Sequence, residues 1–334
     1  MSTFGQNCKV AWAVTCAIGD FVGKFIRHGQ SLLLYPGATS FSEIAQEIIS
    51  PDVFSLPYEL VPLSCSDGVK VEGCLILNPR TNATTTVLLF HGNGANYSMQ
   101  LPMARAFWNM GCHCFLLSYR GFGNCAGSPT EKGLKRDAAA AMEFISSHPI
   151  LSATALVFYG QSLGGAVAID TASRFPDKVA GLVLENTFLS IPKMIPAVMP
   201  ALSSFSWLCM QRWPSEESIQ RIPEATPMLF LSGLCDEVVP SAHMKELHRI
   251  AASPRPTTQD DQHSSLLTCS SRSSSREKIP VETPVDNMKS LSEHRSLQEF
   301  QSGQHNNTFL CEGYWSAVRQ FLIQFNNSSS VNVA

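Results

Sequence analysis

One serine in this chain lies in a pattern that would make it a nucleophile. Ser162 occurs in the motif GQSLGG at residues 160–165, after the apolar run Ala155–Tyr159 and before an alanine-rich stretch that favours a helix. This is G-x-S-x-G between a strand and a helix, a setting that lifts the serine hydroxyl onto a sharp turn. The helix N-terminus there favours a developing negative charge. Because the same short motif also occurs in ordinary turns, the rest of the chain must decide its meaning.

A nucleophilic serine needs a base, and the base needs a carboxylate to orient it. Asp236 follows the predicted buried strand Pro227–Ser232 on a tight turn, where such an acid is required. Its neighbour Glu237 should point elsewhere. Glu185 ends the preceding predicted strand and is the alternative acid. The sequence therefore favours Asp236 and leaves Glu185 as the second candidate.

The base is expected downstream of the acid, where the chain has five histidines: His243, His248, His263, His294 and His305. The first two lie five residues apart in a predicted helix, Ala242–Ala252, and the next two lie in a polar insertion. Only His305 follows a short strand, at about Leu297–Phe300, and precedes a helix, Gly313–Phe325. This context predicts that His305 is the base.

A second glycine-rich loop, HGNGAN at residues 91–96, follows the predicted strand Thr86–Phe90. Backbone N–H groups in such a loop can point at a ligand and stabilise an oxyanion. We expect the oxyanion hole to consist of the N–H groups of Asn93 and Leu163, the latter being the residue after the nucleophile. His91 lies before the serine and is interpreted as a residue that orients this loop.

Strands and helices alternate through most of the chain, which predicts a mostly parallel sheet with right-handed crossovers. A hairpin is expected first, with a turn at Ser66-Asp67-Gly68. The predicted strands are Tyr58–Leu63, Val69–Leu77, Thr86–Phe90, Cys112–Tyr119, Ala155–Tyr159, Gly181–Glu185, Pro227–Ser232 and Leu297–Phe300, and the predicted helices are Met99–Asn109, Leu134–Ser147, Ala242–Ala252 and Gly313–Phe325.

The amino-acid composition limits the classes of protein to which this chain can belong. The chain has 334 residues, of which 44% are hydrophobic, and this is enough for one large α/β domain with a sizeable core. The net charge of −3 gives no electrostatic indication of nucleic-acid binding. The 11 cysteines include no CxxC pair and are interpreted as reduced thiols, not as a disulfide framework or a zinc site. No metal or cofactor is expected.

Residues 1–36 are interpreted as a membrane-associating segment that precedes a catalytic domain at residues 37–325. The apolar run Val10–Gly19 is too short to span a bilayer, and the charged residue Asp20 ends it. Apolar residues from Val14 to Phe25 recur at helical spacing, which favours a helix lying at the membrane surface. A helix packed on the domain and a signal peptide are the alternatives.

Two further segments depart from the alternating pattern. Ser190–Pro223 is rich in proline and large apolar residues and is interpreted as a small helical lid whose apolar side chains line an acyl-binding slot. A helix pair simply packed on the sheet is the alternative. Ser253–Arg295 is rich in serine and charge, a composition typical of a disordered surface insertion. Residues 326–334 are expected to form a disordered tail.

Several segments together resemble the bud-emergence (Bem-type) branch of the α/β-hydrolase superfamily: HGNGAN, YRGFGNCAGSP, GQSLGG, ENTFLSIPKMIP, FLSGLCDEVVP and SGQHNNTFLCEGYW. The resemblance covers roughly residues 30–325 without the insertion. It implies an α/β-hydrolase fold, with a mostly parallel central sheet, helices on both faces and a small helical lid. It also implies a Ser162–Asp236–His305 triad and, in many relatives, an N-terminal membrane anchor.

The function expected from these residues is that of a serine hydrolase that cleaves an ester or thioester through an acyl-enzyme. Relatives include enzymes that remove palmitate from protein cysteines, so depalmitoylation and lipid esterase activity are both implied. A serine peptidase or amidase on the same residues and a non-catalytic scaffold are the alternatives. The expected partners are an acylated lipid or protein and a membrane surface, with no nucleic acid.

Overall fold

The computed structural model describes residues 29–31, 34–35, 47–79, 83–253 and 294–326. They form one sheet with the strand order β1-β2-β4-β3-β5-β6-β7-β8, in which β1 and β2 run antiparallel to their neighbours and all other pairs are parallel. The strands are β1 (Glu59–Ser64), β2 (Lys70–Ile76), β3 (Thr85–Phe90), β4 (His113–Ser118), β5 (Ala155–Gln161), β6 (Gly181–Glu185), β7 (Met228–Gly233) and β8 (Arg295–Phe300).

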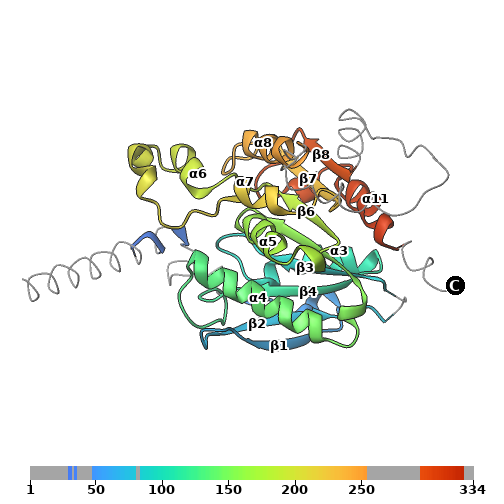
Figure 1. The fold of residues 1–334 in the computed structure, drawn as a ribbon. Coiled ribbons are helices and arrows are strands. Elements are labelled where there is room, and N and C mark those ends of the chain that lie inside the picture. Colours follow the sequence, from blue (N-terminus) through green and yellow to red (C-terminus); the bar gives the residue numbers. More distant parts are fainter. Residues whose placement is uncertain (1–28, 32–33, 36–46, 80–82, 254–293, 327–334) are drawn as a thin grey trace, which may run out of the picture.

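Helices cover both faces of the sheet (Figure 1). The α-helices are α3 (Leu101–Asn109), α4 (Glu131–Ser147), α5 (Leu163–Arg174), α6 (Ile191–Val198), α7 (Ser215–Ser218), α8 (Ala242–Ala251) and α11 (Tyr314–Asn326). Helices α4, α5 and α8 share one hydrophobic core with the sheet, and α3 and α11 share the other. Short 3-10 helices connect these elements: η2 (Pro51–Phe54), η3 (Tyr97–Gln100), η4 (Leu151–Ala153), η5 (Pro176–Lys178), η6 (Pro200–Leu208), η7 (Ile219–Arg221) and η8 (Thr308–Leu310).

Strand β3 contributes side chains to the hydrophobic cores on both faces of the sheet. Leu88 and Phe90 point into the core under α4 and α5, and Val87 and Leu89 point into the core under α3 and α11. Every residue of β3 is buried. A strand that is covered on both faces reads as a continuous apolar run, so these runs predicted the central strands correctly.

The predicted order of strands and helices is confirmed, with small shifts at the ends. Helix α4 begins at Glu131 instead of Leu134, because the Thr130 side chain accepts a hydrogen bond from the N–H of Gly133 and caps the helix there. Helix α3 begins at Leu101, and η3 precedes it with Asn96 as its cap.

Three of the predicted boundaries are wrong. Tyr35 is buried in the main core, and its hydroxyl accepts a hydrogen bond from the Trp213 ring N–H at 2.9 Å, so this residue belongs to the folded domain and not to a membrane segment. Arg295 is also buried and begins β8, where its guanidinium donates to carbonyls that include Pro223 O at 2.6 Å, so the insertion ends before it. Asn326 is the last residue of α11 and not part of a tail.

The parts of the N-terminal segment and of the insertion that the sequence singled out, Val10–Gly19 and residues 254–293, lie outside the described residues. Within the described ranges, no helix combines the length and the hydropathy that a membrane crossing requires. The cysteines that the structure describes are all free, and Cys112 and Cys114 are buried as expected for small apolar side chains.

Candidate active site

Ser162 sits at a strained turn between β5 and α5. Its backbone has φ 54° and ψ −119°, a positive φ that a non-glycine residue adopts at a cost. Glycines make this turn possible, since a Cβ on Gly160 would lie 2.3 Å from the carbonyl oxygen of Gly164, and one on Gly164 would lie 1.9 Å from that of Phe90. The predicted strand–turn–helix setting of the serine is therefore present.

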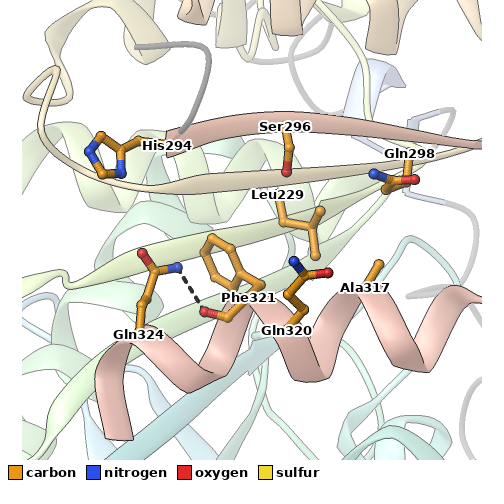
Figure 2. Close-up of a pocket in the computed structure, with 8 residues that line it drawn as sticks. All are labelled: Leu229, His294, Ser296, Gln298, Ala317, Gln320, Phe321 and Gln324. Carbon is orange, nitrogen blue, oxygen red and sulfur yellow. Dashed lines mark hydrogen bonds between the residues drawn. The ribbon is translucent and has the colours of Figure 1, made fainter. Parts of the chain in front are cut away.

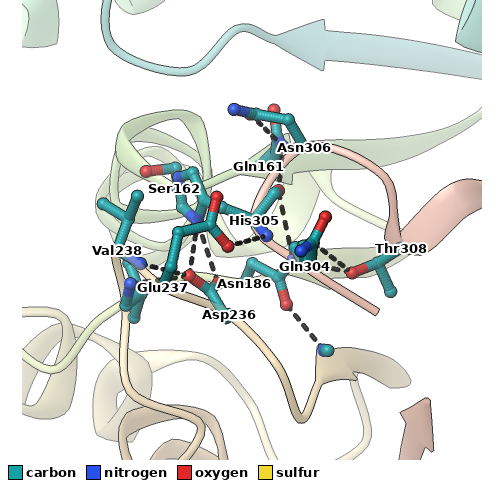
Figure 3. A network of polar contacts seen from close by, with 12 residues as sticks. Gln161, Ser162, Asn186, Asp236, Glu237, Val238, Gln304, His305, Asn306 and Thr308 are labelled. Carbon is teal, nitrogen blue, oxygen red and sulfur yellow. Dashed lines mark hydrogen bonds and ion pairs between the residues drawn. The ribbon is translucent and has the colours of Figure 1, made fainter. Parts of the chain in front are cut away.

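Asp236 and His305 meet, although 69 residues separate them. The Nδ1 atom of His305 lies 2.8 Å from Oδ2 and 3.1 Å from Oδ1 of Asp236 (Figure 3). Both side chains are almost fully buried, with 9% of His305 and 1% of Asp236 exposed. In a neutral ring this contact places the proton on Nδ1 and leaves Nε2 as an acceptor, the tautomer that a general base needs.

The pairing of β7 with β8 brings these two loops together. Gly233, the last residue of β7, pairs with Phe300, the last residue of β8. Beyond the strands, Leu234 N–H donates to Phe300 O and Cys235 N–H donates to Gly303 O, both at 2.9 Å. Because parallel strands end at the same edge of a sheet, Asp236 and His305 reach the edge at which Ser162 also lies.

Three side chains that the sequence analysis did not single out hold the His305 loop (Figure 3). Gln161 donates to His305 O at 2.7 Å, and Asn186 donates to the same carbonyl at 3.2 Å. The Glu237 carboxylate accepts from His305 N–H at 3.2 Å, so this neighbour of Asp236 contacts the backbone of the same residue. Gln161 lies inside GQSLGG and Asn186 inside ENTF, but neither residue type indicates this role without the fold.

His91 fixes the first glycine-rich loop, as the sequence suggested. Its Nε2 accepts from Tyr119 N–H at 3.2 Å, and its Nδ1 lies 2.8 Å from Gly92 O. An accepting Nε2 requires the proton on Nδ1, which then donates to Gly92. The ring is fully buried, and this burial lowers the pKa of His91 to about 4. His91 therefore stays neutral and ties β3 to β4 beside the serine.

A cavity of about 330 Å³ and one of about 610 Å³ lie in different parts of the molecule, and the larger one contains the candidate residues. Ser162 and His305 line it together with Asn93. Among the described residues, the Ser162 hydroxyl and the His305 Nε2 atom have no hydrogen-bond partner. The N–H groups of Asn93 and Leu163 likewise donate to no residue that the structure describes. These atoms are available to a ligand.

Glu185, the alternative acid, lies in the wall of the same cavity but does not contact His305. It is fully buried, and its Oε2 atom accepts hydrogen bonds from the hydroxyl groups of Tyr159, at 2.7 Å, and Tyr314. Burial raises the pKa of this carboxyl. The structure places Asp236, and not Glu185, against the histidine.

The lid interpretation is only half correct. Helical turns do interrupt the alternation between β6 and β7, as predicted. However, no residue of Ser190–Pro223 lines the cavity of Ser162, which is bounded instead by the two glycine-rich turns, η3, α3 and the His305 loop. The apolar residues of this segment therefore do not form a slot for an acyl group bound at the serine.

The smaller cavity is enclosed by β8 and α11 (Figure 2). Its walls are mostly uncharged, with Ser296 and Gln298 on the strand and Gln320 and Gln324 on the helix. His294, one of the five histidines considered as the base, lines it, but Ser162, Asp236, His305, Asn93 and Leu163 do not. The candidate active site is therefore the larger cavity.

Comparison with solved structures identifies the fold. The chain superposes on an esterase of Pyrococcus furiosus with a TM-score of 0.59, at 16% sequence identity, over 84% of this chain and 96% of that one. It also superposes on an α/β hydrolase of Vibrio vulnificus with a TM-score of 0.56, at 16% identity, over 90% of this chain and 92% of that one. The architecture is that of the α/β hydrolases, as the sequence resemblance implied.

Comparison with sequences of known proteins identifies the branch of the superfamily to which the chain belongs. Residues 81–223 match the family model described as serine aminopeptidase, S33. Protein bem46 of Schizosaccharomyces pombe is 40% identical over 73% of this chain and 80% of its own length. An uncharacterized membrane protein of Saccharomyces cerevisiae is 38% identical over 89% and 90%, and the α/β hydrolase domain-containing protein WAV2 of Arabidopsis thaliana is 32% identical over 83% and 82%. The chain therefore belongs to the bem46 branch of the α/β-hydrolase superfamily and is a hydrolase of that fold.

Proposed function

We propose that the chain is a serine hydrolase in which Ser162, Asp236 and His305 form the catalytic triad. The observation that carries this proposal is the contact of His305 Nδ1 with Asp236, in a cavity that the Ser162 hydroxyl shares with His305 Nε2. The backbone N–H groups of Asn93 and Leu163 act as the oxyanion hole. In the absence of substrate, a nucleophile and its base are often farther apart than a hydrogen bond, and they close up when substrate binds.

The reaction proceeds through an acyl-enzyme. Ser162 Oγ bonds to the carbonyl carbon of the substrate while His305 Nε2 takes the serine proton, and the carbonyl oxygen becomes negative in the oxyanion hole. The tetrahedral intermediate then expels an alcohol or a thiol, which receives the proton from His305. Water attacks the acyl-serine in the same way, with His305 as base, and releases the carboxylic acid and free Ser162.

The proposed substrate is an ester or a thioester. Protein depalmitoylation and lipid ester hydrolysis are the two physiological forms that the family resemblance implies, and the lining of the cavity bears on the length of the acyl group. Met99, Met103 and Phe309 give part of the cavity an apolar wall that suits an acyl group. Glu185 and Gln100 also line the cavity, and each has a buried oxygen that no described residue donates to. An apolar chain laid over those oxygens would leave them unsatisfied, which favours short acyl groups.

A peptidase or amidase on the same triad is the second candidate, because the matching family model is described as a serine aminopeptidase. Peptidases of this fold usually carry a large additional domain that selects peptides. Here the segment between β6 and β7 holds only the short helices α6, α7, η6 and η7. Its size favours esters and thioesters over peptides.

A fluorophosphonate probe tests the triad, because it labels a serine only when the base activates it. Wild-type protein should be labelled, and Ser162→Ala should lose all labelling and about 10⁴-fold or more of its turnover. Ser204→Ala, which changes an exposed serine outside the cavity, is the matched control and should behave like wild type. Equal labelling of the Ser162→Ala variant would refute the assignment.

A set of p-nitrophenyl esters and acyl thioesters of increasing chain length, together with aminoacyl p-nitroanilides, then distinguishes the substrate classes. Rapid turnover of short acyl esters is the expected result. A maximum at palmitoyl thioesters would instead identify a depalmitoylating enzyme, and turnover of the anilides alone would identify a peptidase.

We also propose that the N-terminal segment attaches the enzyme to a membrane. Support comes from the apolar run Val10–Gly19, from Lys9, Lys24 and Arg27 around it, and from the yeast relative that is named a membrane protein. Full-length protein should float with liposomes, and a chain that begins at Gly29 should float less. Equal flotation would refute the attachment, and resistance of the full chain to carbonate extraction would indicate a spanning anchor.

A further inference from the structure

The segment between α6 and Trp213 exposes an unusual number of large apolar side chains. We call these six residues, which are between 40% and 71% exposed, the lid patch: Val198, Leu202, Phe205, Trp207, Leu208 and Met210. Trp207 and Phe205 are the most exposed of them, at 71% and 58%. Large contiguous apolar surfaces on soluble domains mark sites of interaction with another molecule or a membrane.

The catalytic cavity does not explain this exposure. No residue of the lid patch lines the cavity of Ser162. Leu202, Phe205 and Leu208 instead border a separate, shallow groove of about 160 Å³, which Leu34 and Met199 complete. Figure 1 shows α6 and the turns after it at one end of the molecule, beside residues 29–31 and 34–35 and away from the sheet.

The lid patch is also free of charge. No charged residue or histidine occurs from Met194 to Gln211, whereas Lys193 and Arg212 stand at its two ends. Short polar residues, such as Ser203 and Ser206, separate the apolar ones. Lys193 is paired with Glu216, so Arg212 is the flanking cation and the uncharged run itself carries the pattern. Apolar and aromatic side chains without charge form the pattern of a segment that inserts into the headgroup region of a bilayer.

The N-terminal segment reaches the domain at this same place. Gln30 Nε2 donates to Leu208 O at 2.9 Å, and Met210 N–H donates to Gln30 Oε1 at 2.7 Å. The apolar run Val10–Gly19 therefore precedes, by only ten residues from Gly19 to Gly29, the point where the chain contacts the lid patch. A lipid surface that held this run would therefore lie within reach of the patch, since ten residues span at most about 35 Å.

We propose that the lid patch is a lipid-binding surface, which inserts Phe205 and Trp207 into the headgroup and upper acyl region of a bilayer. It acts beside the N-terminal segment and gives the domain a second contact with the membrane, so that the domain has a fixed orientation there. This surface does not depend on the proposed hydrolase activity, because none of its residues belongs to the triad or to the cavity.

Hydroxyl-radical footprinting of the full chain tests the contact itself. The probe surface is phosphatidylcholine vesicles that contain about a quarter of anionic phosphatidylserine. Oxidation of Trp207 and Phe205 should fall several-fold when vesicles are added, while that of the exposed residues Val53 and Ile323 should not change. Trp207 that is equally oxidised with and without vesicles would overturn the proposal. Trp207 that is already protected without vesicles would do so as well, since the chain itself or a second copy would then cover the patch.

Flotation with the same vesicles tests how much Phe205 and Trp207 contribute to the affinity of the chain for the membrane. The full chain with Phe205→Ser and Trp207→Ser should bind at least about tenfold more weakly than wild type, because two large apolar side chains no longer leave water. A full chain with Val53→Ser and Ile323→Ser, which removes equally exposed apolar residues elsewhere, should bind within about twofold of wild type. Equal binding of both double variants would overturn the proposal. Circular dichroism and thermal unfolding verify that each variant is folded, independently of any hydrolase activity.

Discussion

Two buried carboxyl groups lie near the ends of neighbouring strands, at the edge of the sheet where Ser162 also lies, and they have different hydrogen-bond partners. Asp236, after β7, accepts hydrogen bonds from the N–H groups of Val238 and Val239, at 2.8 and 2.7 Å, and contacts the His305 ring. Glu185, at the end of β6, accepts from two tyrosine hydroxyls and contacts no ring nitrogen. A position at the end of a strand is therefore not enough to make an acid the partner of the base.

The two carboxyl groups have different partners because Asp236 lies in the loop beyond its strand, whereas Glu185 lies within its strand. Asp236 stands three residues beyond Gly233, on a turn that the β8 loop contacts directly. Glu185 is still inside its strand, where its backbone pairs with Gln161 and its side chain points into the core that Tyr159 and Tyr314 occupy. We therefore assign orientation of the imidazole to Asp236 and a structural role in the cavity wall to Glu185.

The substitution Asp236→Asn tests the difference between the two acids and should have the largest effect on turnover. The amide keeps the size of the side chain but loses the anion that holds the His305 tautomer, so turnover should fall by about 10⁴-fold. Kinetics on a short p-nitrophenyl ester measure the loss, and thermal unfolding checks that the fold persists. Glu185→Gln should cost less than about tenfold in the same assay. If Glu185→Gln proves the more damaging of the two, the acid belongs to β6.

Glu185→Ala should show the next largest effect, on stability instead of turnover. Removing the carboxyl leaves the buried hydroxyls of Tyr159 and Tyr314 without their acceptor, which should lower the free energy of unfolding by about 3 kcal/mol. Chemical denaturation measures this value. Glu185→Gln retains an acceptor oxygen and should lose clearly less. Equal losses in the two variants would contradict this account, because an isosteric amide that keeps an acceptor oxygen would then be as damaging as removal of the whole side chain.

A smaller effect is expected in the pH dependence of stability. Because burial raises the pKa of Glu185, the folded state binds its proton more tightly than the unfolded chain does, and the carboxyl destabilises the fold increasingly as the pH rises from its ordinary pKa through the raised one. Glu185→Gln cannot ionise. The stability of wild type minus that of this variant should therefore decrease as the pH rises from about 4.5 to 8.

Denaturation of both proteins at several pH values gives this difference directly. His91 contributes with the opposite sign, because its pKa of about 4 makes wild type lose stability as the pH falls from about 6.5 toward 4. That contribution is common to wild type and variant and cancels in the subtraction. A difference that stays flat with pH would show that Glu185 titrates alike in the folded and unfolded chain.

The smallest effect is expected from excision of residues 254–293, which separate Asp236 from His305 in sequence. The two flanks of this segment are already joined, since Arg295 donates to Ala251 O and the His248 ring contacts Arg295 O at 2.9 Å. The β7–β8 ladder brings the loop of Asp236 beside the loop of His305. A short turn in their place should leave turnover within about twofold and the melting temperature nearly unchanged. A large fall in either would show that the segment supports the site.

The sequence determined the parts of this protein that depend on local patterns. Apolar runs predicted the central strands, such as β3 and β4, because strands buried on two faces need apolar residues throughout. The edge strands β1 and β8 are partly exposed and carry no such run. Glycine spacing predicted the turn at Ser162, since only glycine fits where Phe90 and Gly164 approach so closely. The rule that catalytic residues follow strand ends reduced five histidines to His305 and placed Asp236 ahead of Glu185.

The tertiary structure decided what depends on contacts between distant segments. Neither the hydrogen bonds of Gln161 and Asn186 to the His305 carbonyl nor the burial of Tyr35 beside Trp213 is visible in the sequence, because amide and tyrosine side chains have no periodic pattern and their partners lie more than a hundred residues away. The same holds for the apolar segment after β6. Its composition is compatible with lining a cavity or facing a membrane, and only the packing of the sheet, the glycine-rich turns and the His305 loop around Ser162 shows that it lies outside the catalytic cavity.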